Sequence, residues 1–133
     1  MTNEELGKCS FLVVDDDEFS RDLIVSALTQ IGATQCHCAE DSEAALRLAT
    51  QHRPDFVLLD IYMPGADGWS VLDSLRRALP NVVVLMITGS IRPSDFSKSM
   101  EKHVDGFCIK PVRSAILLKA LTQARENRSI TKV

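Results

Sequence analysis

Short apolar runs alternate along the chain with segments of helical periodicity, and this alternation limits the possible folds more than any other feature. Three runs are continuously apolar, which is typical of strands buried on both faces of a parallel sheet. They are residues 11–14 (FLVV), 56–59 (FVLL) and 82–87 (VVVLMI). Weaker strand candidates lie at 35–39 and 107–109. We therefore expect five strands.

Between these runs, apolar residues recur at steps of three and four positions, as on the buried face of a helix. The first stripe includes Phe19 and Leu23, and the fourth is narrow, with Phe96, Met100 and Val104. Glycine or proline marks the helix boundaries, at Gly32, Pro54, Pro80 and Pro93. The pattern predicts five helices.

Strict alternation of strands and helices with short connections leaves few topologies, because crossovers between parallel strands are right-handed. We expect an α/β domain with a doubly wound, five-stranded parallel sheet and five helices. The domain is expected to span residues 8–126. Residues 1–7 and 127–133 are expected to be short polar tails that fray.

Composition limits the partners of the chain. Fifteen basic and eighteen acidic residues give a net charge of -3, which argues against nucleic acid or an anionic membrane as the binding partner. No apolar run approaches the roughly 20 residues needed to span a bilayer, so we expect a cytoplasmic protein with protein partners. The four cysteines are expected to be reduced thiols. A metal site at Cys36, His37 and Cys38 is not expected, because neighbouring strand residues point to opposite faces.

Polar residues follow four of the expected strands. The first strand ends in Asp15, Asp16 and Asp17, and the third, fourth and fifth end in Asp60, Thr88 and Lys110. In an open parallel sheet these ends meet at one edge, where ligands bind. Clustered carboxylates favour a hard divalent cation such as Mg²⁺, and a lysine and a hydroxyl group could hold the other oxygens of a phosphoryl group. A carboxylate in such a site can itself be the nucleophile.

Four motifs at these strand ends resemble those of response-regulator receiver domains (CheY-like) of two-component systems. They are VVDDDE at 13–18, DIYMPGADG at 60–68, ITG at 87–89 and IKP at 109–111. The resemblance implies a flavodoxin-like fold whose sheet has the strand order 2-1-3-4-5, and it implies that Asp60 is the phosphoacceptor. It also implies a Mg²⁺ ion held by Asp15, Asp16, Asp60 and the backbone carbonyl of Tyr62, with Asp16 a direct ligand and Asp15 acting mainly through water.

The resemblance also implies a switch. Thr88 and Lys110 would bind the phosphoryl group, with Lys110 positioned by a Lys110–Pro111 peptide bond that is usually cis in this family. Phe107 would turn inward when Thr88 moves, and the surface of the fourth helix, fifth strand and fifth helix would change. A core aromatic residue is the alternative interpretation of Phe107.

The implied partners are a sensor histidine kinase or a histidine phosphotransfer protein, and a downstream protein or a covalently linked output domain. A stand-alone receiver and a domain of a larger regulator both fit the chain. The receiver itself is expected to be a signalling switch that catalyses only its own phosphorylation and dephosphorylation.

Two other functions fit parts of the pattern. In a phosphatase of the haloacid-dehalogenase type, Asp15 would be the nucleophile and Asp17 the general acid, but DIYMPGADG would have no role. A binding module that keeps the fold without phosphorylation is the second alternative.

Some positions have simpler roles or depart from the family. Asp17 and Glu18 are expected to favour the start of the first helix. Residues 102–104 (KHV) stand where many receivers have Ala-Gly-Ala, so the loop before the fifth strand is expected to be reshaped, with His103 at the surface. Ser90 and Tyr62 are expected to flank the phosphoryl site and affect the access of water.

Overall fold

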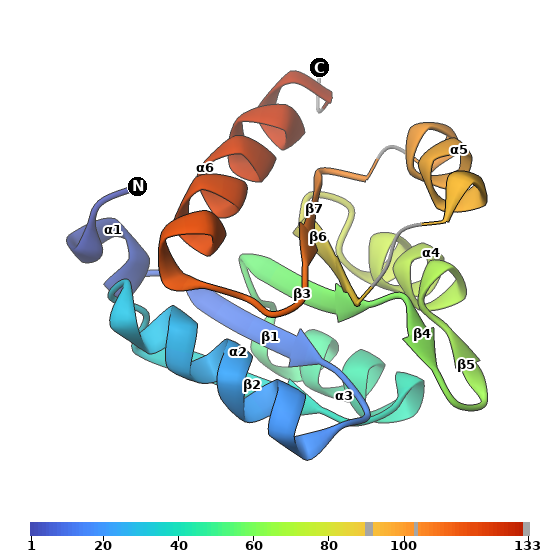
Figure 1. The fold of residues 1–133 in the computed structure, drawn as a ribbon, viewed down its shortest axis with the longest axis horizontal. Helices are drawn as coiled ribbons and strands as arrows, with labels where there is room; N and C mark the ends of the chain where they lie inside the picture. The colour runs from blue at the N-terminus through green and yellow to red at the C-terminus, as the bar shows by residue number, and fades with distance from the viewer. Residues whose placement is uncertain (90–91, 103, 132–133) are drawn as a thin grey trace.

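Five parallel strands form the central sheet of the computed structural model (Figure 1). The structure describes residues 1–89, 92–102 and 104–131, without the side chains of Ala66, Phe96, Ile130 and Thr131. The sheet has the order β2-β1-β3-β6-β7. Its strands are β1 (Ser10–Val14), β2 (Gln35–Ala39), β3 (Phe56–Asp60), β6 (Val83–Thr88) and β7 (Gly106–Ile109). Since β4 and β5 form a separate two-stranded sheet, β6 and β7 are the fourth and fifth strands of the central sheet. The expected flavodoxin-like order 2-1-3-4-5 is therefore confirmed.

Helices cover both faces of the sheet, and each face has its own apolar core (Figure 1). The helices are α1 (Asn3–Gly7), α2 (Glu18–Gln30), α3 (Ser42–His52), α4 (Gly68–Ala78), α5 (Pro93–Glu101) and α6 (Ser114–Thr131). One core lies between the sheet and α2 with α6, and the other between the sheet and α3 with α4. An ion pair of 2.7 Å between Lys102 and Asp73 links the end of α5 to α4. No helix in the described part of the chain is long and apolar enough to span a membrane.

Both ends of the chain are helical, where the sequence predicted polar tails that fray. Leu6 in α1 is 0% exposed and belongs to the core under α2 and α6. Near the other end, Arg128 of α6 is buried against the carboxylate of Asp105, with Arg128 Nε 3.3 Å from Oδ1. Residues 3–7 and 127–131 are therefore helical where polar tails were expected, while the domain bounds of 8–126 and the fraying of the ends stay predictions. A single apolar residue among polar ones has no periodicity that would indicate α1.

The first expected apolar helix stripe is buried less than predicted. Phe19 is 71% exposed, and Leu23 is also exposed, whereas Ile24, Ala27 and Leu28 form the buried face of α2. The reason is geometric: successive helical residues are turned by about 100°, so the row of Phe19 and Leu23 lies beside the buried row. Residue spacing does not distinguish these two adjacent rows.

The narrow stripe of the fourth expected helix differs from the prediction at Met100, and the side chain of Phe96 lies outside the described residues. Met100 is 79% exposed, and Val104 lies after α5 and packs partly against the core under α4. The predicted fourth helix is therefore shorter than its stripe. His103 lies outside the described residues, so the expectation for it stays a prediction.

A two-stranded antiparallel hairpin follows β3, where the sequence predicted turns. It pairs β4 (Tyr62–Met63) with β5 (Ala66–Asp67), and Gly65 between them has a φ of 70°. The first residue of α4, Gly68, lies so close to β3 that an added Cβ would be 2.5 Å from the carbonyl oxygen of Asp60. Only glycine allows this approach. The hairpin and α4 are thus held directly against the end of β3.

Candidate functional site

The register of the parallel strands brings the polar strand ends together. Val14 of β1 pairs with Leu59 of β3, so the next residue of each strand, Asp15 and Asp60, comes at the same level of the sheet. Asp60 pairs with Ile87, which precedes Thr88, and the N–H of Lys110 donates to the carbonyl of Thr88 at 2.8 Å. The four strand-end residues predicted from sequence therefore lie at one edge of the sheet.

Asp15 is buried and both of its carboxylate oxygens accept hydrogen bonds from the protein. Oδ1 accepts from the N–H of Asp17 at 2.9 Å. Oδ2 accepts from the hydroxyl of Ser20 at 2.6 Å and from the ammonium of Lys110 at 2.8 Å. Arg21 donates to the backbone carbonyl of Asp15 at 2.7 Å. The first turn of α2 and the loop after β7 thus fix this carboxylate in one orientation.

Asp60 lies within reach of the same lysine. Its Oδ2 is 3.4 Å from Lys110 Nζ, and its Oδ1 accepts from the N–H of Tyr62 at 3.2 Å. Burial raises the pKa of Asp60 above its ordinary value, while the charge of Lys110 partly opposes this and that of Asp15 adds to it. Burial acts to lower the pKa of Lys110, but the hydrogen bond to Asp15 and the charge of Asp60 raise it overall. Lys110 therefore stays an ammonium group between two carboxylates.

Asp15, Asp16 and Asp60 form the one group of possible metal ligands found among the described residues. Their ligand oxygens all lie within 4.8 Å of one another, and Asp16 is the exposed member. Oxygens around octahedral Mg²⁺ lie roughly 3 to 4 Å apart, so small side-chain adjustments would close the set around one ion. The acidic donor set therefore fits a hard divalent cation. Cys36, His37 and Cys38 do not form such a group, and the ring of His37 is stacked on that of His52 at 3.7 Å.

The remaining predicted site residues surround this centre. Thr88 is fully buried at the end of β6. Phe107 on β7 is half-buried, and its ring meets that of Trp69 edge-on with centroids 6.3 Å apart. The Lys110–Pro111 peptide bond is cis, as expected. Ser90 lies outside the described residues, so its expected effect on water access stays a prediction.

Sequence reasoning missed several residues that hold the site. Ser20 and Arg21 contact Asp15 from the first turn of α2, and Asp95 of α5 accepts from the hydroxyl of Tyr62 at 2.5 Å. The capping role of Asp17 is confirmed, since its side chain accepts from the N–H of Ser20 at 3.0 Å. The cap at Asp17 could have indicated Ser20 from the sequence, because it places Ser20 in the first turn of the helix, close to Asp15. Nothing in the spacing indicated Asp95.

Fold and site together define a class: a flavodoxin-like, doubly wound domain with an acidic site beyond the carboxyl ends of its strands. A comparison with protein families matches residues 11–122 to the response regulator receiver domain. The chain therefore belongs to the response regulator receiver domain family.

Curated relatives agree with this assignment. The chain is 30% identical over 131 residues to the probable transcriptional regulatory protein NarL of Mycobacterium tuberculosis, covering 98% of this chain and 61% of the relative. It is 31% identical over 124 residues to the Regulator of RpoS of Escherichia coli, covering 93% of this chain and 36% of the relative. The chain thus spans less than two thirds of the length of these relatives.

Solved structures give the same fold. Vibrio cholerae chemotaxis protein CheY4 matches with a TM-score of 0.80 at 25% identity, over 87% of this chain and 98% of that one. NtrX from Brucella abortus matches with a TM-score of 0.82 at 28% identity, over 93% of this chain and 28% of that one.

The haloacid-dehalogenase alternative is not favoured, because the Asp15 carboxylate accepts hydrogen bonds from three protein groups and Asp17 caps α2.

Proposed function

We propose that the chain is a phosphorylation switch whose Asp60 accepts a phosphoryl group from a phosphohistidine on a sensor histidine kinase or a phosphotransfer protein. The observation that carries this proposal is the position of Lys110 Nζ, 2.8 Å from Asp15 and 3.4 Å from Asp60. A cation held between two buried carboxylates can turn to a phosphoryl group on either of them, and the contacts among the described residues hold Asp15 more firmly than Asp60.

The transfer itself needs few protein groups. An oxygen of Asp60 attacks phosphorus, an O–P bond forms as the P–N bond breaks, and the electron pair of that bond leaves with the imidazole nitrogen, which takes up a proton. Lys110 pairs with one phosphoryl oxygen and the Thr88 hydroxyl with another. A Mg²⁺ ion, held by Asp16, Asp60 and the Tyr62 carbonyl and through water by Asp15, would neutralise charge on the remaining oxygen.

The switch is proposed to run from Thr88 to Phe107. Thr88 moves toward the phosphoryl group and Phe107 turns inward, which alters the surface of α5, β7 and α6. A downstream protein, or an output domain in the same polypeptide, would bind one form of this surface better than the other. A cytoplasmic location and a role as a switch without other enzymatic activity belong to the same proposal.

Acetyl phosphate labelling tests the phosphoacceptor. The 133-residue chain is incubated with acetyl phosphate and Mg²⁺, and the acyl phosphate is measured by retarded mobility in a phosphate-affinity gel. Asp60→Asn should abolish labelling, whereas Asp22→Asn, at an exposed position on α2, should not change it. Labelling that persists in Asp60→Asn and disappears in Asp15→Asn would contradict the proposal in favour of the phosphatase.

Beryllofluoride distinguishes a working switch from a phosphorylation-incompetent binding module. With Mg²⁺ it should shift the backbone amide signals of Thr88 and Phe107 in a ¹H–¹⁵N spectrum, because it imitates a phosphoryl group on aspartate. Unchanged signals would favour the binding module.

A further inference from the structure

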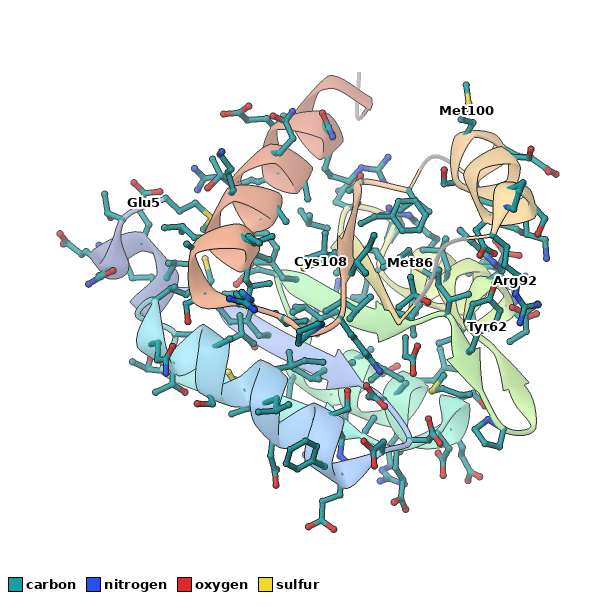
Figure 2. All side chains as sticks on the ribbon, in the orientation of Figure 1. Glu5, Tyr62, Met86, Arg92, Met100 and Cys108 are labelled. Carbon is teal, nitrogen blue, oxygen red and sulfur yellow. The ribbon has the colours of Figure 1, made fainter. Side chains whose placement is uncertain are left out.

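Helix α5 is anchored to the domain through a buried carboxylate. Asp95 is 3% exposed and is the one buried side chain among those described in α5. Met100, by contrast, projects away from the molecule at the far end of the helix (Figure 2). Buried carboxylates are rare unless they are paired or hydrogen-bonded, so the partners of Asp95 determine how this helix is held.

The donors to Asp95 come from two different parts of the chain. Its Oδ2 accepts from the hydroxyl of Tyr62 on β4 at 2.5 Å and from the N–H of Arg92 at 2.9 Å. Although burial raises the pKa of Asp95, these two hydrogen bonds lower it overall. Trp69 of α4 lines the same cavity as Tyr62 and Asp95. One carboxylate therefore connects the hairpin to α5, beside Trp69.

Tyr62 and Trp69 each contact a residue of the proposed switch. Tyr62 is two residues after Asp60, and its N–H donates to Asp60 Oδ1 at 3.2 Å. Trp69 packs edge-on against Phe107, with ring centroids 6.3 Å apart. Tyr62 and Asp95 thus link the phosphoacceptor segment to α5, and Trp69, in the same cavity lining, contacts the switch aromatic.

The space around these contacts is open rather than filled. A cavity of about 530 Å³ lies between the hairpin and α5, lined by Tyr62, Trp69 and Arg92 among others. The guanidinium of Arg92 lies 4.5 Å above the ring of Tyr62, and Figure 2 shows the two side chains side by side. Among the described side chains, Asp95 and Arg92 thus both hold α5 to Tyr62 of the hairpin, and Asp95 is the buried one.

We propose that Asp95 is a positioning residue that couples the phosphorylation of Asp60 to the position of α5 and of Phe107. This inference rests on the proposed function. A buried carboxylate cannot lose a donor without a free-energy cost, so a shift of the segment after Asp60 moves Tyr62 and Asp95 together, and α5 with them. In this proposal α5 is the element that changes position, and Trp69 in the shared cavity lining carries the change to Phe107.

Beryllofluoride titration of Asp95→Asn tests the coupling. Trp69 is the single tryptophan of the chain, so its indole N–H gives one identifiable signal in the ¹H–¹⁵N spectrum. In the wild type, beryllofluoride with Mg²⁺ should shift the signals of Ile61, Trp69 and Phe107. In Asp95→Asn the Ile61 shift should remain, showing that the site is occupied, while the Trp69 and Phe107 shifts fall by about half or more. Full-sized shifts at Trp69 and Phe107 would overturn the proposal.

Two further variants make the result specific. Asp73→Asn is the matched control, because it removes a different carboxylate contact between α4 and α5, the ion pair with Lys102; its shifts should equal those of the wild type. Equal losses in Asp73→Asn and Asp95→Asn would mean that loosening α5 is the whole effect, which also overturns the proposal.

If Asp95→Asn does not fold, Tyr62→Phe removes the hydroxyl donor alone, from an exposed side chain. Its Trp69 and Phe107 shifts, divided by the Ile61 shift, should again be reduced, and an unchanged ratio would reject the coupling. A wild type without any response to beryllofluoride would instead refute the proposed function. The two failures are therefore distinguishable.

Discussion

At the scale of single residues, Asp15 and Asp60 differ although both are buried aspartates at neighbouring strand ends. Asp15 has three side-chain hydrogen bonds from the protein, and Ser20 and Lys110 share its Oδ2. If Lys110 turns toward a phosphoryl group, the hydroxyl of Ser20 can still donate to Asp15 Oδ2. Ser20 would thereby keep the buried carboxylate from being left without a partner, which costs about 1–3 kcal/mol or more.

The substitution Ser20→Ala should slow labelling by acetyl phosphate. Loss of about 1 kcal/mol of stabilisation at Asp15 corresponds to a roughly fivefold lower rate. The rate is measured from the time course of gel retardation at fixed Mg²⁺. Ser20→Thr retains the hydroxyl and should restore most of the rate, and Ser129→Ala on the exposed face of α6 is the control. Equal rates for Ser20→Ala and the wild type would exclude this role.

Asp95 should make stability depend on pH in the acid range. Its pKa in the folded protein is below the ordinary 3.8, so the carboxylate is favoured by folding. Its contribution is fully present above 3.8 and is lost as pH falls through the lower folded pKa. The difference in free energy of unfolding between wild type and Asp95→Asn should thus be constant from about pH 7 to pH 5 and shrink in stronger acid. Urea unfolding measures it, and a difference that grows on acidification would contradict the assigned direction.

At the scale of secondary-structure elements, the helices are held in two different ways. Helices α2, α3, α4 and α6 bury apolar residues against the sheet, whereas the described side chains of α5 bury Asp95 alone. Helices held by a few polar contacts open and shift more readily than those held by packing. Judged by the side chains that the structure describes, α5 is therefore the helix best suited to change position.

Helix α1 is short, but it belongs to the packed part of the molecule. Leu6→Ala should lower the free energy of unfolding by about 2–4 kcal/mol, because Leu6 is completely buried and its removal leaves a cavity. Urea or thermal unfolding measures the change. Leu23→Ala, on the exposed row of α2, is the matched control and should cost less than about 1 kcal/mol. A loss at Leu6 no larger than at Leu23 would mean that α1 is not packed in solution.

At the scale of the whole molecule, the sheet separates two apolar cores and presents its charged edge between them. Asp15, Asp16 and Asp60 place three carboxylates at this edge. Their mutual repulsion opposes folding, and a bound cation would relieve it. The stability of the entire domain should therefore depend on Mg²⁺.

Addition of Mg²⁺ should stabilise the domain. At about ten times its Kd, the ion would raise the free energy of unfolding by about 1.4 kcal/mol. Thermal or urea unfolding at matched ionic strength measures this, with NaCl in place of the magnesium salt as the control. Asp16→Asn removes the exposed ligand and should abolish most of the gain. A gain of equal size in Asp16→Asn would place the ion elsewhere.

Most of the fold could be predicted because its signals are local. Continuous apolar runs at 11–14 and 56–59 lie in strands β1 and β3, the run at 82–87 lies in β6 except for Val82 just before it, and Pro93 begins α5 as expected. The exposed row of Phe19 and the buried Leu6 could not be predicted, because burial depends on which neighbour covers a side chain. The same limit applies to the hairpin, whose two-residue strands are too short for a pattern.

Sequence alone determined the succession of strands and helices along the chain and the residues at the strand ends, since alternation and strand-end positions are properties of the chain itself. Asp15, Asp60, Thr88 and Lys110 were therefore identifiable before any coordinates. Only the tertiary structure decided which donors surround them, because Ser20, Tyr62 and Asp95 meet through helix orientation and sheet register rather than through spacing in the chain. Contacts such as Tyr62 with Asp95, 33 residues apart, exist only once the two sides of the cavity are brought together.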